Sequence, residues 1–239
     1  MSSIFKKALV ALTGLLLIGF LVTHLAGNLY LFGGAKHFDR YAETLEKMGP
    51  LLIAAEVGLA AVFLVHVGLA IRLTFENKAA RGGTGYEVHE NQSAAPSRFM
   101  IVSGILIAIF IVLHIRAFKF GPREEYGGSL YAVVMNAFAH PGVAAFYMLS
   151  MLILGSHLTH GFWSVFQTFG LVKPAKRDKV RKVCALLGWG LALGFLTLPL
   201  FGLLKQDKTE KGLEGAVKKL TGQAEGATGG LASADRDAR

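Results

Sequence analysis

The sequence has a single cysteine and few charged side chains. One cysteine, Cys184, excludes a disulfide scaffold. Charged residues make up only 17% of the 239 residues and hydrophobic residues 53%, which excludes a disordered or fibrous chain. Acidic residues are the scarcer sign, with 16 against 25 Lys and Arg. In a soluble protein this excess would indicate nucleic acid. Here the basic residues separate long apolar runs, so we interpret them as a topology signal and expect no nucleic-acid partner.

Five apolar runs are long enough to cross a bilayer, which takes about 20 residues. They cover residues 8–32, 50–75, 99–120, 141–169 and 183–204. Spanning β segments are shorter and alternate apolar with polar residues, and a backbone in lipid must bond to itself, so five helices follow. Pro50 and Pro141 suit the first turn of the second and fourth helix. The first run is too long for a cleavable signal peptide, and four more spans follow it. We therefore predict an all-α integral membrane protein over residues 1–204.

The remaining segments are polar. Residues 205–239 are rich in Lys, Glu, Gly, Ala, Ser and Thr, so we expect a largely disordered tail, in which residues 211–220 could form a short amphipathic helix. The connection 76–98 contains a Gly-rich stretch from Arg81 to Gly85, which predicts a flexible turn. We find no internal repeat strong enough to use.

The distribution of Lys and Arg predicts the orientation. Twelve lie at the N-terminus and in the second–third and fourth–fifth connections, against six in the other two connections. Short basic loops stay in the cytoplasm, so we expect a cytoplasmic N-terminus and an outer tail. The tail carries seven basic residues of its own, which argue mildly against this assignment.

Each of the first four runs contains a histidine deep inside it. Ionisable residues in a membrane are costly and usually functional. A single such histidine is often only a hydrogen-bonded interior residue, but one in each of four helices is hard to explain by accident. The four are His24, His66, His114 and His157.

The depths of these histidines predict two pairs. Each lies about 15 or 16 residues into its run, which is about 24 Å along a helix. Because successive helices run in opposite directions, His24 and His114 share the level nearer the outside, and we call them the outer pair. His66 and His157 share the level nearer the cytoplasm, and we call them the inner pair. The two levels lie about 12 Å apart.

Two histidines on different helices are what bis-histidine haem ligation requires, because each neutral imidazole gives one nitrogen to the iron. Two haems at this spacing would carry electrons across the bilayer. Small residues near the ligands fit a flat macrocycle, although close helix packing favours them equally. These residues are Gly19, Gly27, Gly68, Gly104, Gly155 and Gly161.

Other interpretations are weaker but stay open. His160 lies three residues after His157 and competes with it, although depth prefers His157. Metal transport usually needs carboxylates level with the histidines, and Glu56, the only carboxylate well inside a span, lies ~15 Å from His66. The pattern also differs from a complex III cytochrome b, where two helices carry two ligands each.

With these histidines the sequence resembles a known family, the dihaem cytochrome b membrane anchors of succinate:quinone oxidoreductases and fumarate reductases, in the single-subunit, five-helix class. The resemblance covers about residues 5–204. It rests on GFLVTHLAGN from Gly19, FLVH ending at His66, LH at His114 with Arg116 behind it, and HLTHGFWS from His157. The last motif maps the ligand to His157 rather than His160.

The resemblance implies two b haems, with the inner and outer pairs as axial ligands, and a quinone, usually menaquinone. It also implies partners: a flavoprotein carrying FAD and an iron–sulfur subunit, in a bacterial cytoplasmic membrane. Some fumarate reductases of this class have a Glu two residues before the fourth-helix ligand, for proton movement. Here that position is Gly155, so this proton route is doubtful.

We also predict further site residues from their positions along the chain. Haem propionates need cationic partners, and Arg72, Arg98 and Arg116 lie near helix ends. Glu56 and His37 are candidates for the vicinity of an outer quinone site.

The preferred function is the membrane anchor and electron-transfer subunit of succinate dehydrogenase (complex II), which is an enzyme only as a complex and could form a higher oligomer. The alternatives are a cytochrome b subunit of fumarate reductase or of another quinone-linked dehydrogenase, and a haem-free structural anchor. A metal transporter is a distant further alternative.

Overall fold

The computed structural model describes the backbone of residues 2–80 and 94–234, and the side chains of residues 2–80 and 99–206. Every regular element of the described backbone is a helix. Five helices are long and apolar enough to cross a membrane: Ser3–Gly33, Pro50–Ala80, Phe99–Lys119, Pro141–Thr168 and Pro174–Gln206. This confirms the predicted all-helical fold with five spans. The Gly-rich stretch 81–85 lies outside the described residues.

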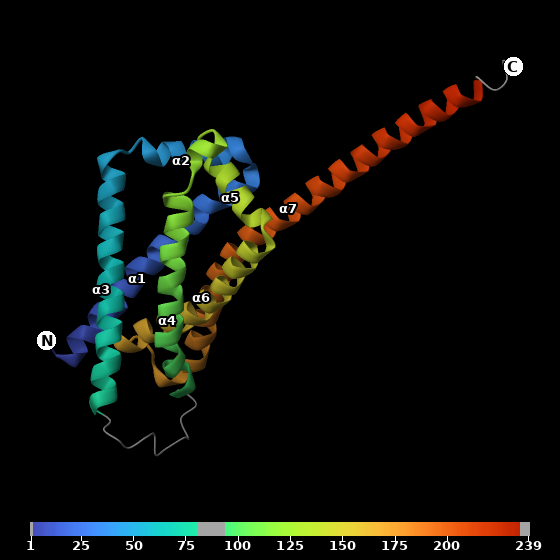
Figure 1. The fold of residues 1–239 in the computed structure, drawn as a ribbon. Coiled ribbons are helices and arrows are strands. Elements are labelled where there is room, and N and C mark those ends of the chain that lie inside the picture. Colours follow the sequence, from blue (N-terminus) through green and yellow to red (C-terminus); the bar gives the residue numbers. More distant parts are fainter. Residues whose placement is uncertain (1, 81–93, 235–239) are drawn as a thin grey trace.

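Successive spans run in opposite directions along the bundle (Figure 1). The first span begins with α1, Ser3–Asn28, and the side chain of its N-cap residue Ser2 accepts a hydrogen bond from the Phe5 N–H. The other elements are η1 (Leu29–Gly33), α2 (Ala35–Glu46), α3 (Pro50–Ala80), α4 (Ala94–His114), the π-helix η2 (Ile115–Lys119), η3 (Arg123–Tyr126), α5 (Leu130–Ala139), α6 (Pro141–Thr168), η4 (Pro174–Lys176) and α7 (Arg177–Ala234).

Helices α6 and α7 pack closely because small residues face each other's backbone. A side-chain carbon added at Gly188 of α7 would lie 2.6 Å from the Thr159 nitrogen of α6. One added at Gly155 would lie 2.6 Å from the Trp189 ring. Gly155 therefore occupies a place where a larger side chain has no room, which gives a physical reason for the absence of a carboxylate there.

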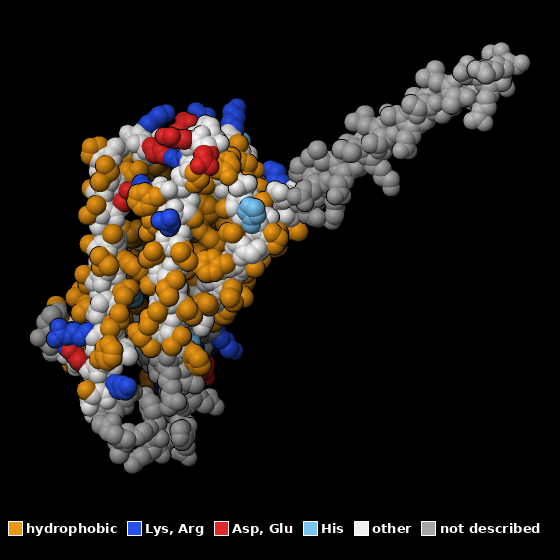
Figure 2. Space-filling view, viewed as in Figure 1, with side chains coloured by type: hydrophobic (Ala, Val, Ile, Leu, Met, Phe, Trp, Pro, Cys, Tyr) orange, Lys and Arg blue, Asp and Glu red, His pale blue; other side chains and the backbone are white. Residues whose placement is uncertain are grey.

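The outer surface of the bundle suits lipid. Figure 2 shows hydrophobic side chains over the sides of the helices and charged side chains gathered towards their ends. On α3, Leu51, Ile53, Val57 and Leu64 are more than 60% exposed. Such an apolar belt would be costly in water, and a bilayer is the solvent that removes the cost.

Polar contacts join neighbouring helical segments at both ends of the bundle. At the end of α2 and α5, the Asp39 carboxylate accepts hydrogen bonds from the Ser129 hydroxyl (2.7 Å) and the Tyr131 N–H (2.8 Å). At the opposite end, the buried Lys6 of α1 forms an ion pair with Glu76 of α3. These contacts fix the bundle where lipid no longer surrounds it.

The segment after residue 204 continues as part of α7, which ends at Ala234. Its abundant Lys, Glu and Ala are good helix formers, so a helical continuation agrees with the composition. The side chains after Gln206 lie outside the described residues. The expectation of a largely disordered tail therefore stays a prediction.

Candidate functional site

The structure brings the two outer histidines together inside the bundle. His24 of α1 and His114, the last residue of α4, have ring centroids 5.9 Å apart with their planes at 90°. Phe20 stacks on His24 at 5.1 Å, and Phe110 stacks on His114 at 5.6 Å. Each phenylalanine lies one helical turn before its histidine, so the same helix positions both rings.

Each of the two inner histidines, His66 of α3 and His157 of α6, contacts a hydroxyl of a neighbouring helix. Nδ1 of His66 lies 3.1 Å from the Thr13 hydroxyl of α1, and Nδ1 of His157 lies 3.0 Å from the Ser103 hydroxyl of α4. Both imidazoles are therefore held by a neighbouring helix as well as by their own.

The outer pair fits a haem iron. A bond between a metal and an imidazole nitrogen is about 2 Å long, so two nitrogens on opposite sides of one iron are about 4 Å apart and the ring centroids about 6 Å apart. The observed 5.9 Å agrees with this separation. Among the residues that the structure describes, Nδ1 of His114 and the Tyr147 hydroxyl are buried without a hydrogen-bond partner. Unsatisfied buried polar atoms are rare, and a bound group or water commonly explains them.

The histidines occur in pairs rather than in larger clusters. Within the described residues, no three His, Cys, Asp or Glu side chains gather where they could hold one metal ion. A structural zinc site uses four such ligands, whereas bis-histidine haem ligation uses two. The pairs therefore favour haem over a tetrahedral metal site.

His157 and His160 have different surroundings. Nδ1 of His160 lies 3.0 Å from the Ser156 carbonyl of its own helix, and this contact is exposed. His157 instead contacts Ser103 of the neighbouring α4. The contact across the bundle favours His157 as the ligand, in agreement with its depth.

The six glycines that we named near the ligands have different environments. A carbon added at Gly104 would lie 3.4 Å from Cε1 of His157. Additions at Gly27 and Gly155 would strike Tyr41 and Trp189, so these two glycines serve helix packing. Gly19, Gly68 and Gly161 have nothing within 4 Å of the added carbon.

Gly14 lies beside His66 and is not among the glycines expected near a ligand. A carbon added at Gly14 would lie 3.2 Å from Cε1 of that ring. Gly14 lies ten residues before His24, and Gly104 lies ten residues before His114. This equal spacing was the signal that could have found it.

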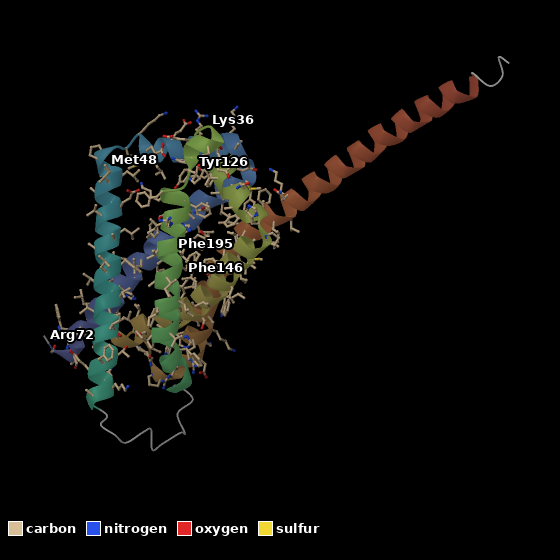
Figure 3. All side chains as sticks on the ribbon, in the orientation of Figure 1. Lys36, Met48, Arg72, Tyr126, Phe146 and Phe195 are labelled. Carbon is tan, nitrogen blue, oxygen red and sulfur yellow. The ribbon has the colours of Figure 1, made fainter. Side chains whose placement is uncertain are left out.

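Two of the candidate propionate partners, Arg72 of α3 and Arg116 of η2, belong to different helical elements. Arg72 forms a 2.9 Å ion pair with Glu76, and Figure 3 shows it at the edge of the bundle, beside the N-terminal part of α1. The side chain of Arg98 lies outside the described residues. Arg116 belongs to η2 and lines a surface hollow.

That hollow is lined by residues on either side of His114 in the sequence. It has a volume of about 410 Å³ and is lined by Leu113, Arg116, Ala117, Phe120, Gly121 and Pro122. Glu56 of α3 forms a 2.5 Å ion pair with Lys119 of the same π-helix. Nδ1 of His37 instead lies 2.9 Å from the Gly33 carbonyl, and no described contact joins this residue to Glu56. The structure thus brings Glu56, but not His37, to the helix that lines the hollow.

Comparison with known proteins gives one curated relative. The chain is 24% identical over 186 residues to the succinate dehydrogenase cytochrome b558 subunit of Bacillus subtilis (strain 168), a match that covers 76% of this chain and 87% of that protein. No family model matches the chain, and no solved structure matches it. The relative confirms the resemblance that the histidine motifs indicated.

Proposed function

We propose that the chain is the cytochrome b membrane anchor and electron-transfer subunit of a succinate dehydrogenase complex, with two bis-histidine b haems. The observation that carries the proposal is the outer ring pair, His24 and His114, placed at iron-spanning separation between two transmembrane helices. The inner pair, His66 and His157, supplies a second set of ligands at another level. The similarity to a succinate dehydrogenase cytochrome b558 subunit supports this choice of complex.

The residues of this chain would bind and orient the haems, which would supply reversible one-electron chemistry. His24 and His114 would hold the outer haem, and His66 and His157 the inner one. The aromatic side chains Phe110, Tyr147 and Phe195 pack near the outer pair and exclude water from it. A dry, apolar surrounding is one of the levers by which a protein sets a redox potential.

The proposed orientation predicts the end of the bundle at which the partner subunits would bind. The basic connection between α6 and α7 and the N-terminus of α1 lie at the same end of the bundle (Figure 1). By the distribution of Lys and Arg this end faces the cytoplasm of a bacterium. The flavoprotein with FAD and the iron–sulfur subunit would bind there, and the inner pair is nearer to them.

We place the quinone at the hollow beside η2, at the outer end. Its volume of about 410 Å³ lies in the range of small-molecule sites, roughly 300–1,000 Å³. The ion pair of Glu56 and Lys119 provides a proton acceptor and a donor next to it. By the family resemblance the quinone is menaquinone.

A reduced-minus-oxidised spectrum with a haem-to-protein ratio tests the proposed function. We expect two b-type haems per chain in the full-length protein purified from bacterial membranes with detergent. A purified, folded chain with no haem would leave a structural anchor as the function. One haem that is insensitive to both outer histidines would indicate a different cytochrome.

Glu56→Gln tests the quinone site. The amide keeps the size of the side chain but cannot accept a proton, so we expect quinone turnover of the assembled complex to fall roughly tenfold or more. The haem spectrum should not change, since Glu56 contacts η2 rather than a histidine ring. Steady-state succinate:quinone activity and the spectrum are measured together.

Glu46→Gln is the matched control, because Glu46 also forms an ion pair, with Arg123, on the α2 side of the bundle. Its turnover should match that of the unsubstituted complex. Equal turnover in Glu56→Gln, with an unchanged haem spectrum, would remove Glu56 from the quinone site.

A further inference from the structure

Helices α1 and α4 carry the same arrangement of residues. Each has a hydroxyl residue followed by glycine, then a phenylalanine seven residues and a histidine eleven residues after the hydroxyl. All four positions on α4 are numbered ninety higher than their equivalents on α1. The matched residues are Thr13 with Ser103, Gly14 with Gly104, Phe20 with Phe110 and His24 with His114.

The contacts of the two helices match as well. Each hydroxyl contacts the imidazole of the neighbouring long helix: Thr13 contacts His66, and Ser103 contacts His157. His66 and His157 are ninety-one residues apart and each lies sixteen residues after a helix-starting proline. The same chemical arrangement therefore occurs twice, in the α1–α3 pair and in the α4–α6 pair.

The position of the hydroxyl protons decides which partner donates. A hydroxyl has one proton and two lone pairs. The Thr13 hydroxyl donates its proton to the Leu9 carbonyl at 2.8 Å, and the Ser103 hydroxyl donates to the Met100 carbonyl at 3.1 Å. With its proton on that carbonyl, each oxygen can accept from the imidazole, and on this ground we assign the ring hydrogen to Nδ1. Nε2 is left with a free lone pair, which is the form that binds a metal.

We propose that Thr13 and Ser103 are positioning residues that fix the tautomer and the ring plane of the inner haem ligands His66 and His157. This inference rests on the proposed function. The arrangement is specific to the inner pair: within the described part of the chain, Nδ1 of the outer ligand His114 has no hydrogen-bond partner. An acceptor at Nδ1 makes the imidazole more basic, so it stabilises the oxidised iron of the inner haem.

Thr13→Val and Ser103→Ala test the proposal in the full-length chain, purified from bacterial membranes with both haems bound. We expect the midpoint potential of one haem to shift upward in a potentiometric titration, because its ligand donates less electron density. The low-spin signal of the same haem in electron paramagnetic resonance should also shift, since this signal depends on the ring planes. Both variants should affect the same haem, the one that His66→Ala removes.

The chain offers matched controls. Thr23 of α1 donates to the Phe20 carbonyl and Ser150 of α6 to the Phe146 carbonyl, and within the described side chains neither contacts a histidine ring, so Thr23→Val and Ser150→Ala should leave both potentials unchanged. Thr13→Ser and Ser103→Thr keep the hydroxyl and place in each helix the residue of the other, so they should retain the original potentials. Ser103→Cys keeps the size but accepts weakly, and we expect a shift in the same direction as for Ser103→Ala if that variant does not fold.

Three results would overturn the proposal. Unmoved potentials and resonance signals in Thr13→Val and Ser103→Ala, with two haems bound, would show that the hydroxyls do not position the ligands. Equal shifts in Thr23→Val or Ser150→Ala would show a general packing effect. An unsubstituted chain without haem would reject the proposed function itself and the positioning role with it, so the two failures are distinguishable.

Discussion

Replacing His66 with alanine should halve the haem content of the purified chain, from two haems to one. An iron held between two imidazoles depends on both, and loss of either ligand leaves the haem weakly bound. His157→Ala should remove the same haem as His66→Ala, whereas His24→Ala and His114→Ala should remove the other. The haem-to-protein ratio and the remaining absorption band identify which haem is lost.

Double variants make this expectation sharper. His66→Ala combined with His157→Ala should cost no more haem than either alone, because both act on one iron. His66→Ala combined with His24→Ala should remove all haem. His160→Ala is the control and should keep both haems, since this ring contacts its own helix. Loss of both haems in the first double variant, with the chain still folded, would contradict the pairing.

Gly188→Val should separate α6 from α7 and cause a large loss of stability. Even the first side-chain carbon would lie 2.6 Å from the Thr159 nitrogen, and a backbone atom cannot rotate away. Overpacking of this kind costs about 1–3 kcal/mol, which lowers the melting temperature by several degrees in a chain of this size. Heating in detergent, followed by the loss of helical circular dichroism, measures the shift.

Gly190→Val is the matched control, two residues further along the same helix. A carbon added at Gly190 has nothing within 4 Å, and both variants change helix propensity equally. Its melting temperature should stay close to that of the original chain. Equal melting temperatures for Gly188→Val and Gly190→Val would show that α6 and α7 are not packed as tightly as Thr159 and Gly188 indicate.

The five spans could be predicted from the sequence because every backbone polar group in lipid must be hydrogen-bonded within the protein. An apolar run of sufficient length must form a helix, and each of the five runs did. The meeting of His24 with His114 followed from depth and the alternating direction of the helices. Both arguments need only position along the chain, which the sequence states directly.

Contacts that depend on the rotation of a helix were not predicted. The Thr13 hydroxyl faces His66, but a threonine inside a helix commonly bonds only to its own backbone. The pairing of Glu56 with Lys119 needs the π-helix η2, whose extra turn residue has no clear sequence signature. The short helices α2 and α5 lie in segments that we treated as connections, because neither is long enough to span a bilayer. Repeated spacing in α1 and α4 was present in the sequence, but its meaning emerged only when the contacts matched.

Each of α1 and α4 holds a residue of both levels: a hydroxyl beside one inner histidine and, eleven residues later, an outer histidine. Eleven residues of α-helix span about 16 Å along the helix axis, which is longer than the separation of about 12 Å expected from the histidine depths, and this length is set by the rise of the backbone rather than by any loop. If the two levels hold haems, as proposed, the distance between them is set by the hydrogen-bonded geometry of two uninterrupted helices. Electron tunnelling falls steeply with distance, so a rigid spacer of this kind would keep the transfer rate constant while the connections and the surrounding lipid change.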